Sequence, residues 1–377
     1  MPSLLLIASL ANSFIGFRQP LIRALLDAGV RVHVAAPDVT TNERVRNVLQ
    51  SMGVILHDIP MVRTGMNPFR DIRSLLALRR LMREIQPTYV LGYTIKPVVY
   101  GGLAARLARV PHRFALITGL GYAFMDEDRS TKRRFINYIA RKLYQLSLRS
   151  AERVFFQNPD DQQLFNDTGI LNSHTPTTVV NGSGVDIDEY PHTPLPPPTP
   201  IRFLLIARLI ADKGIREYAQ AAAIIKQRYP EVQFDLVGRL DTNPNAIRQE
   251  ELDEWVASGL VNHLGYLTDV RPSIADCHVY VLPSYREGTP RSTLEALSMG
   301  RAVITTDAPG CRETVIVGVN GFLVPTKDAA ALAIAMERFI NSPELIAQMG
   351  LHSRQLATEK YDVRIVNEQM LKGMGIV

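Results

Sequence analysis

Residues 278–300, HVYVLPSYREGTPRSTLEALSMG, contain the strand, loop and helix pattern that decides the fold. The apolar run His278–Leu282 predicts a buried strand, and the polar residues after Pro283 predict a loop. The segment Thr289–Gly300 predicts a short helix with a Thr cap, Pro at the first helical position and Gly past the end. A strand that leads directly into a helix is the repeating unit of parallel α/β sheets.

The same alternation of short apolar strands and amphipathic helices extends through the whole chain. In the C-terminal half, the predicted strands are Ile201–Ala207, Val232–Val237, Val261–Leu264, His278–Leu282, Ala302–Thr305 and Phe322–Val324. In the N-terminal half, they are Ser3–Ser9, Arg31–Ala35, Val54–Asp58, Tyr89–Gly92, Phe114–Ile117 and Val154–Phe156. A chain of 377 residues favours two domains. The pattern therefore predicts an α/β protein with two Rossmann-like, doubly wound parallel sheets.

A proline-rich stretch lies between the two halves. Residues 191–200, PHTPLPPPTP, cannot continue a helix or a central strand, because proline fixes φ and lacks a backbone donor. We expect a first domain over residues 1–190, a stiff linker over residues 191–200 and a second domain over residues 201–360.

The composition is that of a globular protein without a disulfide framework. Hydrophobic residues make up 46% and charged residues 21% of the chain, and there are only two cysteines, Cys277 and Cys311. We expect both to be reduced thiols. No apolar run approaches the roughly 18 residues that span a bilayer, and Leu4–Leu10 is too short for a signal peptide and lacks a basic leader. A cytoplasmic location is the default expectation.

Basic residues are concentrated in the N-terminal half. Residues 1–190 hold 23 Lys and Arg against 16 Asp and Glu, which leaves 19 against 21 for residues 191–377. The basic residues are dense in two stretches, residues 63–83 and residues 129–153. Such stretches attract anionic partners. They contain few interleaved aromatic residues and no nucleic-acid recognition module, so we expect no nucleic acid among those partners.

The predicted strand order locates the ligand loops of the second domain. In a doubly wound sheet, ligands bind beyond the carboxyl ends of the first and fourth strands, where the order reverses. In the C-terminal half these ends lead into the loops Arg208–Gly214 and Ser284–Thr289. Both loops contain fixed charges.

The residues of these loops suit a diphosphate attached to a sugar. The amides around Arg291, Ser292 and Thr293, in the first turn of the predicted helix, form a seat for phosphate. Arg208 and Lys213 add two cations for a leaving group whose negative charge grows as the sugar departs. Carboxylates such as Glu287 and Glu295 instead accept hydrogen bonds from sugar hydroxyls.

With these residues in view, the chain resembles retaining glycosyltransferase family 4, which has the GT-B fold. Glu287 and Glu295 match the family's E-x7-E element, and Arg208 with Lys213–Gly214 matches its R…KG element. The resemblance covers nearly the whole chain, including residues 180–186 (VNGSGVD) and 318–324 (GVNGFLV). It implies that the last helix, within residues 361–377, crosses back to the first domain.

The resemblance also implies residue roles. Arg208 and Lys213 would bind the donor diphosphate, Glu287 would orient the transferred sugar, and Glu295 would hold the ribose. The predicted catalytic set is therefore Glu287, Arg208 and Lys213. The predicted donor-binding set is Glu295, Arg291, Ser292, Thr293, Gly288, Gly238, Tyr266 and Gly16.

The first domain is expected to bind the acceptor. The same topological rule selects its loops at residues 11–18 and 92–97, in which Arg18 and Lys96 suit an anionic acceptor and Gly16 permits close backbone approach. The alternative is that both cations are ordinary surface residues. The predicted acceptor-binding set is Asn12, Phe14, Arg18, Lys96, Thr118 and Gly119.

Two segments resemble family members that extend polyprenyl-diphosphate-linked glycans, often with N-acetylhexosamines. These are residues 94–107 (TIKPVVYGGLAARL) and 118–124 (TGLGYAF). The resemblance implies transfer of a hexose or N-acetylhexosamine, with UDP-GalNAc as the expected donor, to a polyprenyl-diphosphate-linked sugar in O-antigen, capsule or glycan synthesis. Lys96 would be a candidate for the acceptor diphosphate.

A membrane-bound acceptor agrees with the basic stretches. Residues 129–153 combine basic residues with apolar residues at helical spacing, and they would either attach to an anionic membrane or pack into the core. The apolar residues are Phe135, Ile136, Ile139, Leu143, Leu146 and Leu148. We expect peripheral attachment to the inner face of the cell membrane through stretches 63–83 and 129–153.

The chain departs from the family in one loop. Many members carry a His after the fifth N-terminal strand, whereas residues 117–122 here are ITGLGY. No side chain is an obvious general base. The retaining mechanism drawn for the family tolerates this if the departing diphosphate oxygen accepts the acceptor's proton.

Other functions are less well supported by the motifs. No G-x-G-x-x-G follows the first strand and no Gly-Lys dipeptide exists, which argues against dinucleotide and P-loop sites. Residues 126–128 (DED) and 186–188 (DID) resemble a metal-binding D-x-D, but capping or solvent exposure is the stronger interpretation. No His and Cys cluster has zinc spacing. We expect neither metal nor cofactor. Two alternatives stay open: a sugar-nucleotide epimerase or phosphorylase of the same architecture, and a non-catalytic membrane-associated binding protein.

Overall fold

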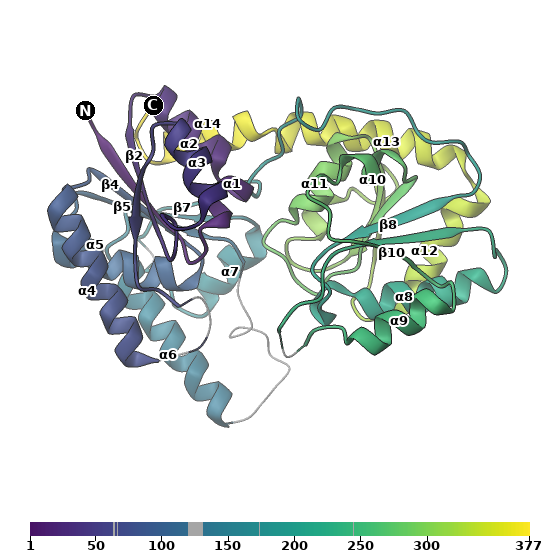
Figure 1. Cartoon of the computed structure of the whole chain (residues 1–377), viewed down its shortest axis with the longest axis horizontal. Coiled ribbons are helices and arrows are strands. Elements are labelled where there is room, and N and C mark those ends of the chain that lie inside the picture. The colour runs from purple at the N-terminus through teal and green to yellow at the C-terminus, as the bar shows by residue number, and fades with distance from the viewer. Residues whose placement is uncertain (63–64, 66, 120–130, 173, 244) are drawn as a thin grey trace. The chain divides into compact units, whose positions relative to one another are not determined.

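The computed structural model of the chain describes residues 1–62, 65, 67–119, 131–172, 174–243 and 245–377, with the side chains of residues 131–136 left out. The chain divides into two compact units (Figure 1). The first comprises Met1–Ser183 and Val366–Val377, and the second comprises Gly184–Ile365.

The first unit is built on a seven-stranded parallel sheet of order β3-β2-β1-β4-β5-β6-β7. Its strands are β1 (Ser3–Ile7), β2 (Arg31–Ala36), β3 (Ile55–Asp58), β4 (Tyr89–Tyr93), β5 (His112–Ile117), β6 (Arg153–Phe156) and β7 (Thr177–Val179). Its helices are α1 (Asn12–Phe17), α2 (Gln19–Asp27), α3 (Glu43–Ser51), α4 (Pro68–Ile85), η1 (Pro97–Gly101), α5 (Gly102–Ala108), α6 (Thr131–Leu148) and α7 (Pro159–Asp167).

The second unit contains a six-stranded parallel sheet of order β10-β9-β8-β11-β12-β13. Its strands are β8 (Arg202–Ile206), β9 (Gln233–Val237), β10 (Asn262–Gly265), β11 (Val279–Leu282), β12 (Ala302–Thr306) and β13 (Gly321–Val324). Its helices are η3 (Ala211–Lys213), α8 (Ile215–Lys226), α9 (Gln249–Ala257), α10 (Arg271–Ala275), α11 (Arg291–Ser298), η4 (Arg312–Thr314), α12 (Ala329–Asn341), α13 (Glu344–Leu356) and η5 (Ala357–Tyr361).

The predicted fold class is confirmed. Every predicted strand is present, to within two residues at each end, and the second sheet has the expected order with β8 beside β11. The edge strand β7 was missed, because its three residues, TTV, are too short to give a periodic signal.

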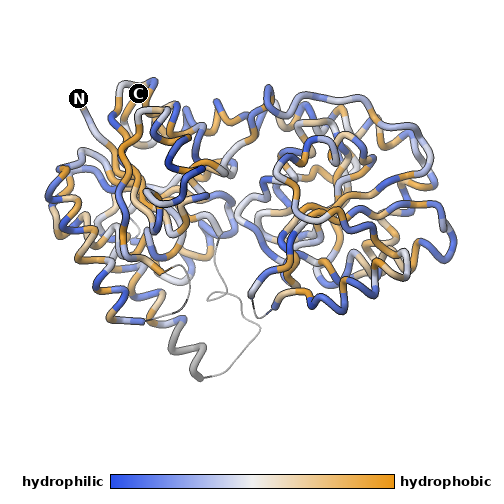
Figure 2. The backbone as a smooth tube through the Cα atoms, in the orientation of Figure 1, coloured by the Kyte–Doolittle hydropathy of each residue, from blue (hydrophilic) through white to orange (hydrophobic). Residues whose placement is uncertain are grey.

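Helices on both faces bury the two sides of each sheet. Leu4 and Leu6 of β1 face one apolar cluster, whereas Leu5 and Ile7 face another. The strands are correspondingly apolar along their length, while hydrophilic and apolar residues alternate along the helices (Figure 2). Strands buried on both faces are the signature of a doubly wound parallel sheet.

The expected linker is placed differently in the structure. The units divide between Ser183 and Gly184, before the proline-rich stretch. That stretch packs on the second unit, where the buried Arg301 donates to Thr193 O at 2.9 Å and Pro194 O at 3.1 Å. Proline lacks a donor but keeps its carbonyl, so an interior guanidinium can hold such a segment.

The last helix, α14 (Val363–Gly373), contributes to the core of the first unit. Val366, Met370 and Leu371 pack with strands of the first sheet, and Arg153 Nε of β6 donates to Gly373 O at 2.9 Å. The chain therefore returns to its N-terminal unit at its end.

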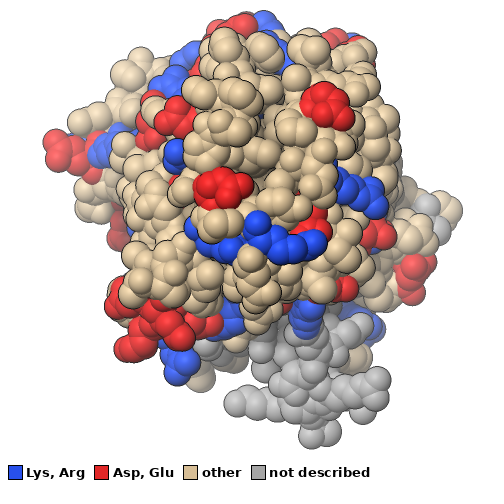
Figure 3. All heavy atoms as spheres, turned by 90° about the vertical axis from the view of Figure 1, so that its right-hand side faces the viewer, with Lys and Arg blue, Asp and Glu red and all other residues tan. Residues whose placement is uncertain are grey.

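Charged residues are mixed on the surface that Figure 3 presents, which shows acidic and basic side chains scattered among uncharged ones. Within the part of the chain that the structure describes, no helix is both long and apolar enough to cross a membrane. Cys277 and Cys311 are buried and free, as expected, and burial raises the pKa of each thiol to about 12.

Candidate active site

The loops that follow β8 and β11 meet at the carboxyl edge of the second sheet. The two strands pair directly, with Val279 opposite Phe203. Gly214, at φ 69°, lies so close to Pro283 that a Cβ would overlap the Pro283 carbonyl oxygen. Tyr285 N also donates to Asp212 O at 2.9 Å. The topology and these contacts bring together the two loops that sequence reasoning selected.

Lys213 and Glu287 join the two loops through an ion pair. Ser284 Oγ donates to the same carboxylate oxygen, Glu287 Oε1, at 2.8 Å. The side chains of Lys213 and Glu287 are 18% and 14% exposed, so the pair is shielded but still accessible. Two predicted catalytic residues are thus within contact of each other.

Glu295 lies deeper, on α11, and is only 7% exposed. Arg291 Nε, one turn earlier, donates to Glu295 Oε1 at 2.8 Å. Burial raises the pKa of Glu295, while the Arg291 charge and hydrogen bonds from Arg291 and the Tyr190 hydroxyl oppose that rise. The carboxylate is therefore held in one place by two donors.

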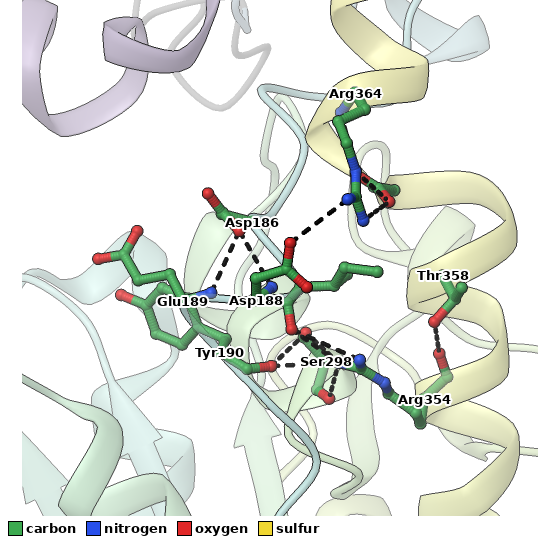
Figure 4. A network of polar contacts seen from close by, with 10 residues as sticks. Asp186, Asp188, Glu189, Tyr190, Ser298, Arg354, Thr358 and Arg364 are labelled. Carbon is green, nitrogen blue, oxygen red and sulfur yellow. Dashed lines mark hydrogen bonds and ion pairs between the residues drawn. The ribbon is translucent and has the colours of Figure 1, made fainter.

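Tyr190 is itself fixed by a network of backbone contacts (Figure 4). Ser298 Oγ of α11 donates to Tyr190 O at 2.6 Å, and Arg354 Nη1 of α13 donates to Tyr190 O at 3.2 Å and Ser298 O at 2.8 Å. The network ties the segment that enters the second unit to two of its helices. It sets the position from which the Tyr190 ring reaches Glu295.

The start of α11 differs from the prediction. The N-cap is Pro290 and has no side-chain cap, since Thr289 Oγ1 donates to its neighbour Gly288 O at 3.0 Å. The expected Thr cap is wrong because proline at the cap position moves the first helical residue to Arg291. Gly300, at φ 79°, follows the end of the helix as predicted.

Ser292 and Thr293 direct their side chains inward. Ser292 Oγ donates to Ile206 O at 3.2 Å and accepts from Tyr280 OH at 2.7 Å, and Thr293 is fully buried. Thr293 N donates to Pro290 O at 3.1 Å. Thr293 is therefore not available to the predicted phosphate seat, and Ser292 can contribute only its amide.

Arg208 of the predicted catalytic set follows β8, and Gly238 and Tyr266 of the predicted donor-binding set follow β9 and β10. Arg208 Nη1 donates to Asp241 Oδ2 at 3.1 Å, and its side chain is 46% exposed. Gly238 lies against Ala207, whose carbonyl oxygen a Cβ would overlap. Tyr266 is 62% exposed, with the Arg239 guanidinium 5.5 Å from its ring centroid. Arg208 is thus paired with Asp241 and not with Glu287.

In the first unit, two predicted acceptor residues are buried. Phe14 is fully buried in the core and packs edge-on against Tyr93, with ring centroids 6.1 Å apart. Its assignment to the acceptor site is wrong, because its ring completes the core beneath α1. Arg18 is 3% exposed, with its guanidinium carbon 5.2 Å from the Tyr93 ring centroid. The positive charge of Arg18 is therefore buried within the first unit.

Lys96 is also partnered. Its Nζ donates to Asp71 Oδ1 of α4 at 2.8 Å, and the two side chains are 12% and 8% exposed. An anionic ligand at Lys96 would share the ammonium group with this carboxylate. The neighbouring Thr94 has φ 69°, which is rare for a β-branched residue, and Ser9 and Thr94 hydroxyl oxygens are 3.1 Å apart.

The remaining predicted residues of this unit are exposed or partly exposed. Asn12 Oδ1 accepts from Asn42 Nδ2 at 3.3 Å, and Gly16 of α1 has open space around the position of a Cβ. Thr118 and Gly119 follow β5 and are half-buried. Residues 120–130 lie outside the described residues. They include the DED motif, Arg129 and the rest of the loop in which the family's His is absent.

The DID motif has a structural role, as expected. Asp186 Oδ1 accepts from Asp188 N at 3.0 Å and Glu189 N at 3.1 Å, which is a local turn, and Asp188 faces Arg364 (Figure 4). Over the described ranges, no group of three or more His, Cys, Asp or Glu side chains could hold a metal ion.

Sequence reasoning missed several residues that hold the predicted site residues within each unit. Ser284 could have been identified from the sequence, because it lies in the same loop as Glu287. Tyr190, Asp71 and Asp241 had no local signal, since each is distant in sequence from its partner. What the second unit assembles is a cation, an accessible carboxylate and a buried carboxylate around a helix N-terminus, a combination suited to a phosphorylated sugar.

Comparison with known protein families separates the same two halves. A model described as glycosyl transferase 4-like matches residues 4–158, and one described as glycosyl transferases group 1 matches residues 200–342. Together they cover all strands of the two sheets except the edge strand β7.

Curated relatives match along nearly the whole chain. The N,N'-diacetylbacillosaminyl-diphospho-undecaprenol alpha-1,3-N-acetylgalactosaminyltransferase of Campylobacter jejuni is 27% identical over 368 residues, which cover 94% of each chain. The capsular polysaccharide biosynthesis glycosyltransferase CapM of Staphylococcus aureus is 24% identical and covers 93% of this chain and 92% of its own.

Solved structures share the fold. Sucrose-phosphate synthase from Thermosynechococcus elongatus superposes with a TM-score of 0.79 at 18% identity, covering 99% of this chain and 98% of that one. HepE from Anabaena, in complex with UDP, gives 0.78 at 19% identity over the full length of both chains.

Proposed function

This chain is a glycosyltransferase of GT-B fold with a glycosyl transferase 4-like and a group 1 domain, and from that premise we propose that it uses a UDP-sugar to extend a polyprenyl-diphosphate-linked saccharide. The observation that carries the proposal is the pairing of Lys213 with Glu287 across the two loops at the switch point. One cation for the diphosphate and one carboxylate for the sugar hydroxyls stand side by side there.

Each donor-site group has a proposed task. Lys213 and Arg208 neutralise the diphosphate as the sugar departs, and the amides at the start of α11 bind phosphate oxygen. Glu287 orients the transferred sugar. Glu295, fixed by Arg291 and Tyr190, accepts the ribose hydroxyls.

We assign a retaining mechanism without a protein base. The bond from the anomeric carbon to the diphosphate oxygen breaks, the acceptor oxygen bonds to that carbon on the same face, and its proton passes to the departing diphosphate oxygen. Two cationic side chains supply the charge stabilisation, so the proposal includes neither metal nor cofactor. Turnover that is abolished by chelation would contradict that part.

The names of relatives support the donor and acceptor. The Campylobacter relative is named for N-acetylgalactosamine transfer to a diphospho-undecaprenol saccharide, and an Escherichia coli relative for UDP-galactose transfer to one. HepE was solved with UDP. We therefore propose UDP-GalNAc as the donor, in the synthesis of an O-antigen, capsule or related glycan.

A lipid-linked acceptor is anchored in a membrane, so the enzyme must reach the membrane surface to use it. We propose peripheral attachment to the inner face of the cell membrane through the basic stretches 63–83 and 129–153. The excess of basic residues in the first half of the chain supports this location.

A transfer assay tests the function. Purified enzyme is incubated with UDP- and GDP-sugars and a polyprenyl-diphosphate-linked saccharide, and both nucleotide release and glycolipid are measured. We expect one UDP-sugar to give a glycolipid whose new linkage keeps the donor's anomeric configuration by NMR. Conversion of the sugar nucleotide without acceptor would instead support an epimerase or phosphorylase, and binding without turnover a non-catalytic role.

A further inference from the structure

Helix α4 of the first unit has an unusual outer face. Its buried residues, Asp71, Ser74, Leu78 and Met82, form a stripe that packs on the sheet. On the other side, Phe69, Ile72 and Leu76 are 86%, 56% and 52% exposed. The outer face of a surface helix is normally polar, so three large apolar side chains at helical spacing are unexpected there.

Basic residues lie on the same outer face of α4. Arg73, Arg80 and Arg83 are exposed. At 100° per residue, these three and the apolar stripe lie within about 100° of one another, opposite the buried stripe. Among the residues that the structure describes, none of these three guanidinium groups is in an ion pair. The face thus combines apolar groups with three exposed arginines that form no ion pair among the described residues.

The helix is tied to the proposed acceptor loop. Asp71, on the inner side of its first turn, holds Lys96 at 2.8 Å. In the sequence α4 follows β3, so its first turn lies at the carboxyl edge of the sheet, where the acceptor loops also begin (Figure 1). Phe69 and Ile72 of the apolar stripe and the contact between Asp71 and Lys96 therefore lie on opposite sides of the start of α4.

From this arrangement we propose that α4 is a membrane-docking helix, which inserts Phe69, Ile72 and Leu76 among the lipids of an anionic bilayer. Arg73, Arg80 and Arg83 contact the lipid headgroups. Apolar side chains with flanking arginines are the composition that interfacial helices share. The inference rests on the proposed lipid-linked acceptor, and it adds the element that brings Lys96 to the bilayer surface.

Vesicle flotation tests the inference without any sugar substrate. The full chain is mixed with vesicles of phosphatidylcholine and phosphatidylglycerol, and with phosphatidylcholine alone. We expect binding that requires the anionic lipid. The triple variant F69S/I72S/L76S should bind at least about tenfold more weakly, because three apolar side chains no longer leave water. The variant R73E/R80E/R83E should bind at least about a hundredfold more weakly, since each basic residue near the surface adds roughly a factor of five.

A matched variant controls for general loss of surface hydrophobicity. Val256, Ile334 and Leu351 are 44%, 58% and 62% exposed on helices of the second unit. The variant V256S/I334S/L351S should bind vesicles like the wild type. Far-UV circular dichroism and thermal melts establish that every variant is folded. Absent binding by the wild type, or equal binding by F69S/I72S/L76S, overturns the proposal.

Activity separates this inference from the proposed function. The variant F69S/I72S/L76S should transfer sugar normally to a short-chain, water-soluble acceptor and poorly to an acceptor in vesicles. If it loses both activities equally, α4 acts on the site and not on the membrane. If the wild type binds vesicles but transfers sugar to neither acceptor, the docking helix stands and the proposed function fails.

Discussion

The Lys213 ammonium group is ion-paired with the Glu287 carboxylate, and the pair connects the loop after β8 to the loop after β11. These two strands are neighbours in the sheet, with Leu204 opposite Tyr280, although these two residues are 76 positions apart in the sequence. The ion pair is therefore a tertiary contact that exists only because the strand order reverses at this point.

Loss of either partner should strongly reduce the rate of transfer. Lys213→Ala removes a cation from the departing diphosphate, and Glu287→Ala removes a sugar ligand, so we expect kcat to fall at least about a hundredfold in each. Steady-state rates of UDP release measure this. Arg228→Ala breaks another ion pair of the same unit, with Glu337, and should leave the rate unchanged. Normal activity in Lys213→Ala would remove this residue from the mechanism.

Gly214 should be intolerant of a side chain. Gly214 and Gly259 have nearly equal φ values, 69° and 68°, but a Cβ at Gly214 overlaps Pro283 whereas one at Gly259 meets nothing within 4 Å. Gly259→Ala should cost about 1 kcal/mol of stability from the backbone alone and keep activity. Gly214→Ala should also displace Lys213 and lose activity. Chemical denaturation followed by Trp255, the single tryptophan, measures the second unit.

Tyr190→Phe should make donor binding sensitive to acid. Burial raises the pKa of Glu295, and the Tyr190 hydroxyl opposes the rise by stabilising the charged carboxylate. Without that hydroxyl the pKa rises further, so Glu295 becomes protonated at a higher pH as the solution is acidified. UDP affinity is measured by calorimetry at several pH values. As the pH is lowered, it should weaken at a higher pH in Tyr190→Phe than in the wild type.

Tyr229→Phe provides the control for this experiment. The Tyr229 hydroxyl donates to Asn341 Oδ1 at 3.1 Å, away from the site, so its removal should leave the pH profile unchanged. Identical profiles for Tyr190→Phe and the wild type would show that Glu295 does not depend on Tyr190.

Stability of the first unit should depend on His33. His33 Nδ1 and His57 Nε2 are 2.9 Å apart, and burial with the neighbouring His57 lowers the pKa of His33 to about 4. The unfolded chain then binds the proton more readily, so stability is full above the ordinary pKa of about 6.5 and falls as the pH drops toward 4. His33→Gln should flatten this dependence in urea unfolding followed by circular dichroism, and an unchanged slope would contradict it.

The regular part of the fold was predictable because both sheets are buried on two faces. Strands such as Val279–Leu282 are then apolar without interruption, and their order places the ligand loops before any motif is considered. Thr177–Val179 at the sheet edge was too short to stand out. The proline-rich segment was misplaced because its attachment depends on Arg301, about a hundred residues later in the chain.

The motifs indicated candidate site residues, but not the partners that these residues have in the structure. Lys213, Glu287, Arg291 and Glu295 lie in motif segments, and the structure joins them in pairs. Phe14 could not be distinguished from a surface aromatic, because only the packing against Tyr93 shows that it belongs to the core. Tyr190 reaches Glu295 across the unit, a contact that no sequence spacing reveals.

The central claim is that the second unit binds the nucleotide of the donor at this switch point. The most direct measurement is a calorimetric titration of UDP into the wild type, Lys213→Ala and Arg228→Ala. We predict saturable binding to the wild type and to Arg228→Ala, and binding weakened at least about tenfold in Lys213→Ala, because a charge-assisted hydrogen bond to phosphate is lost. Equal affinity in all three proteins, or no binding of UDP to the wild type, would contradict the account.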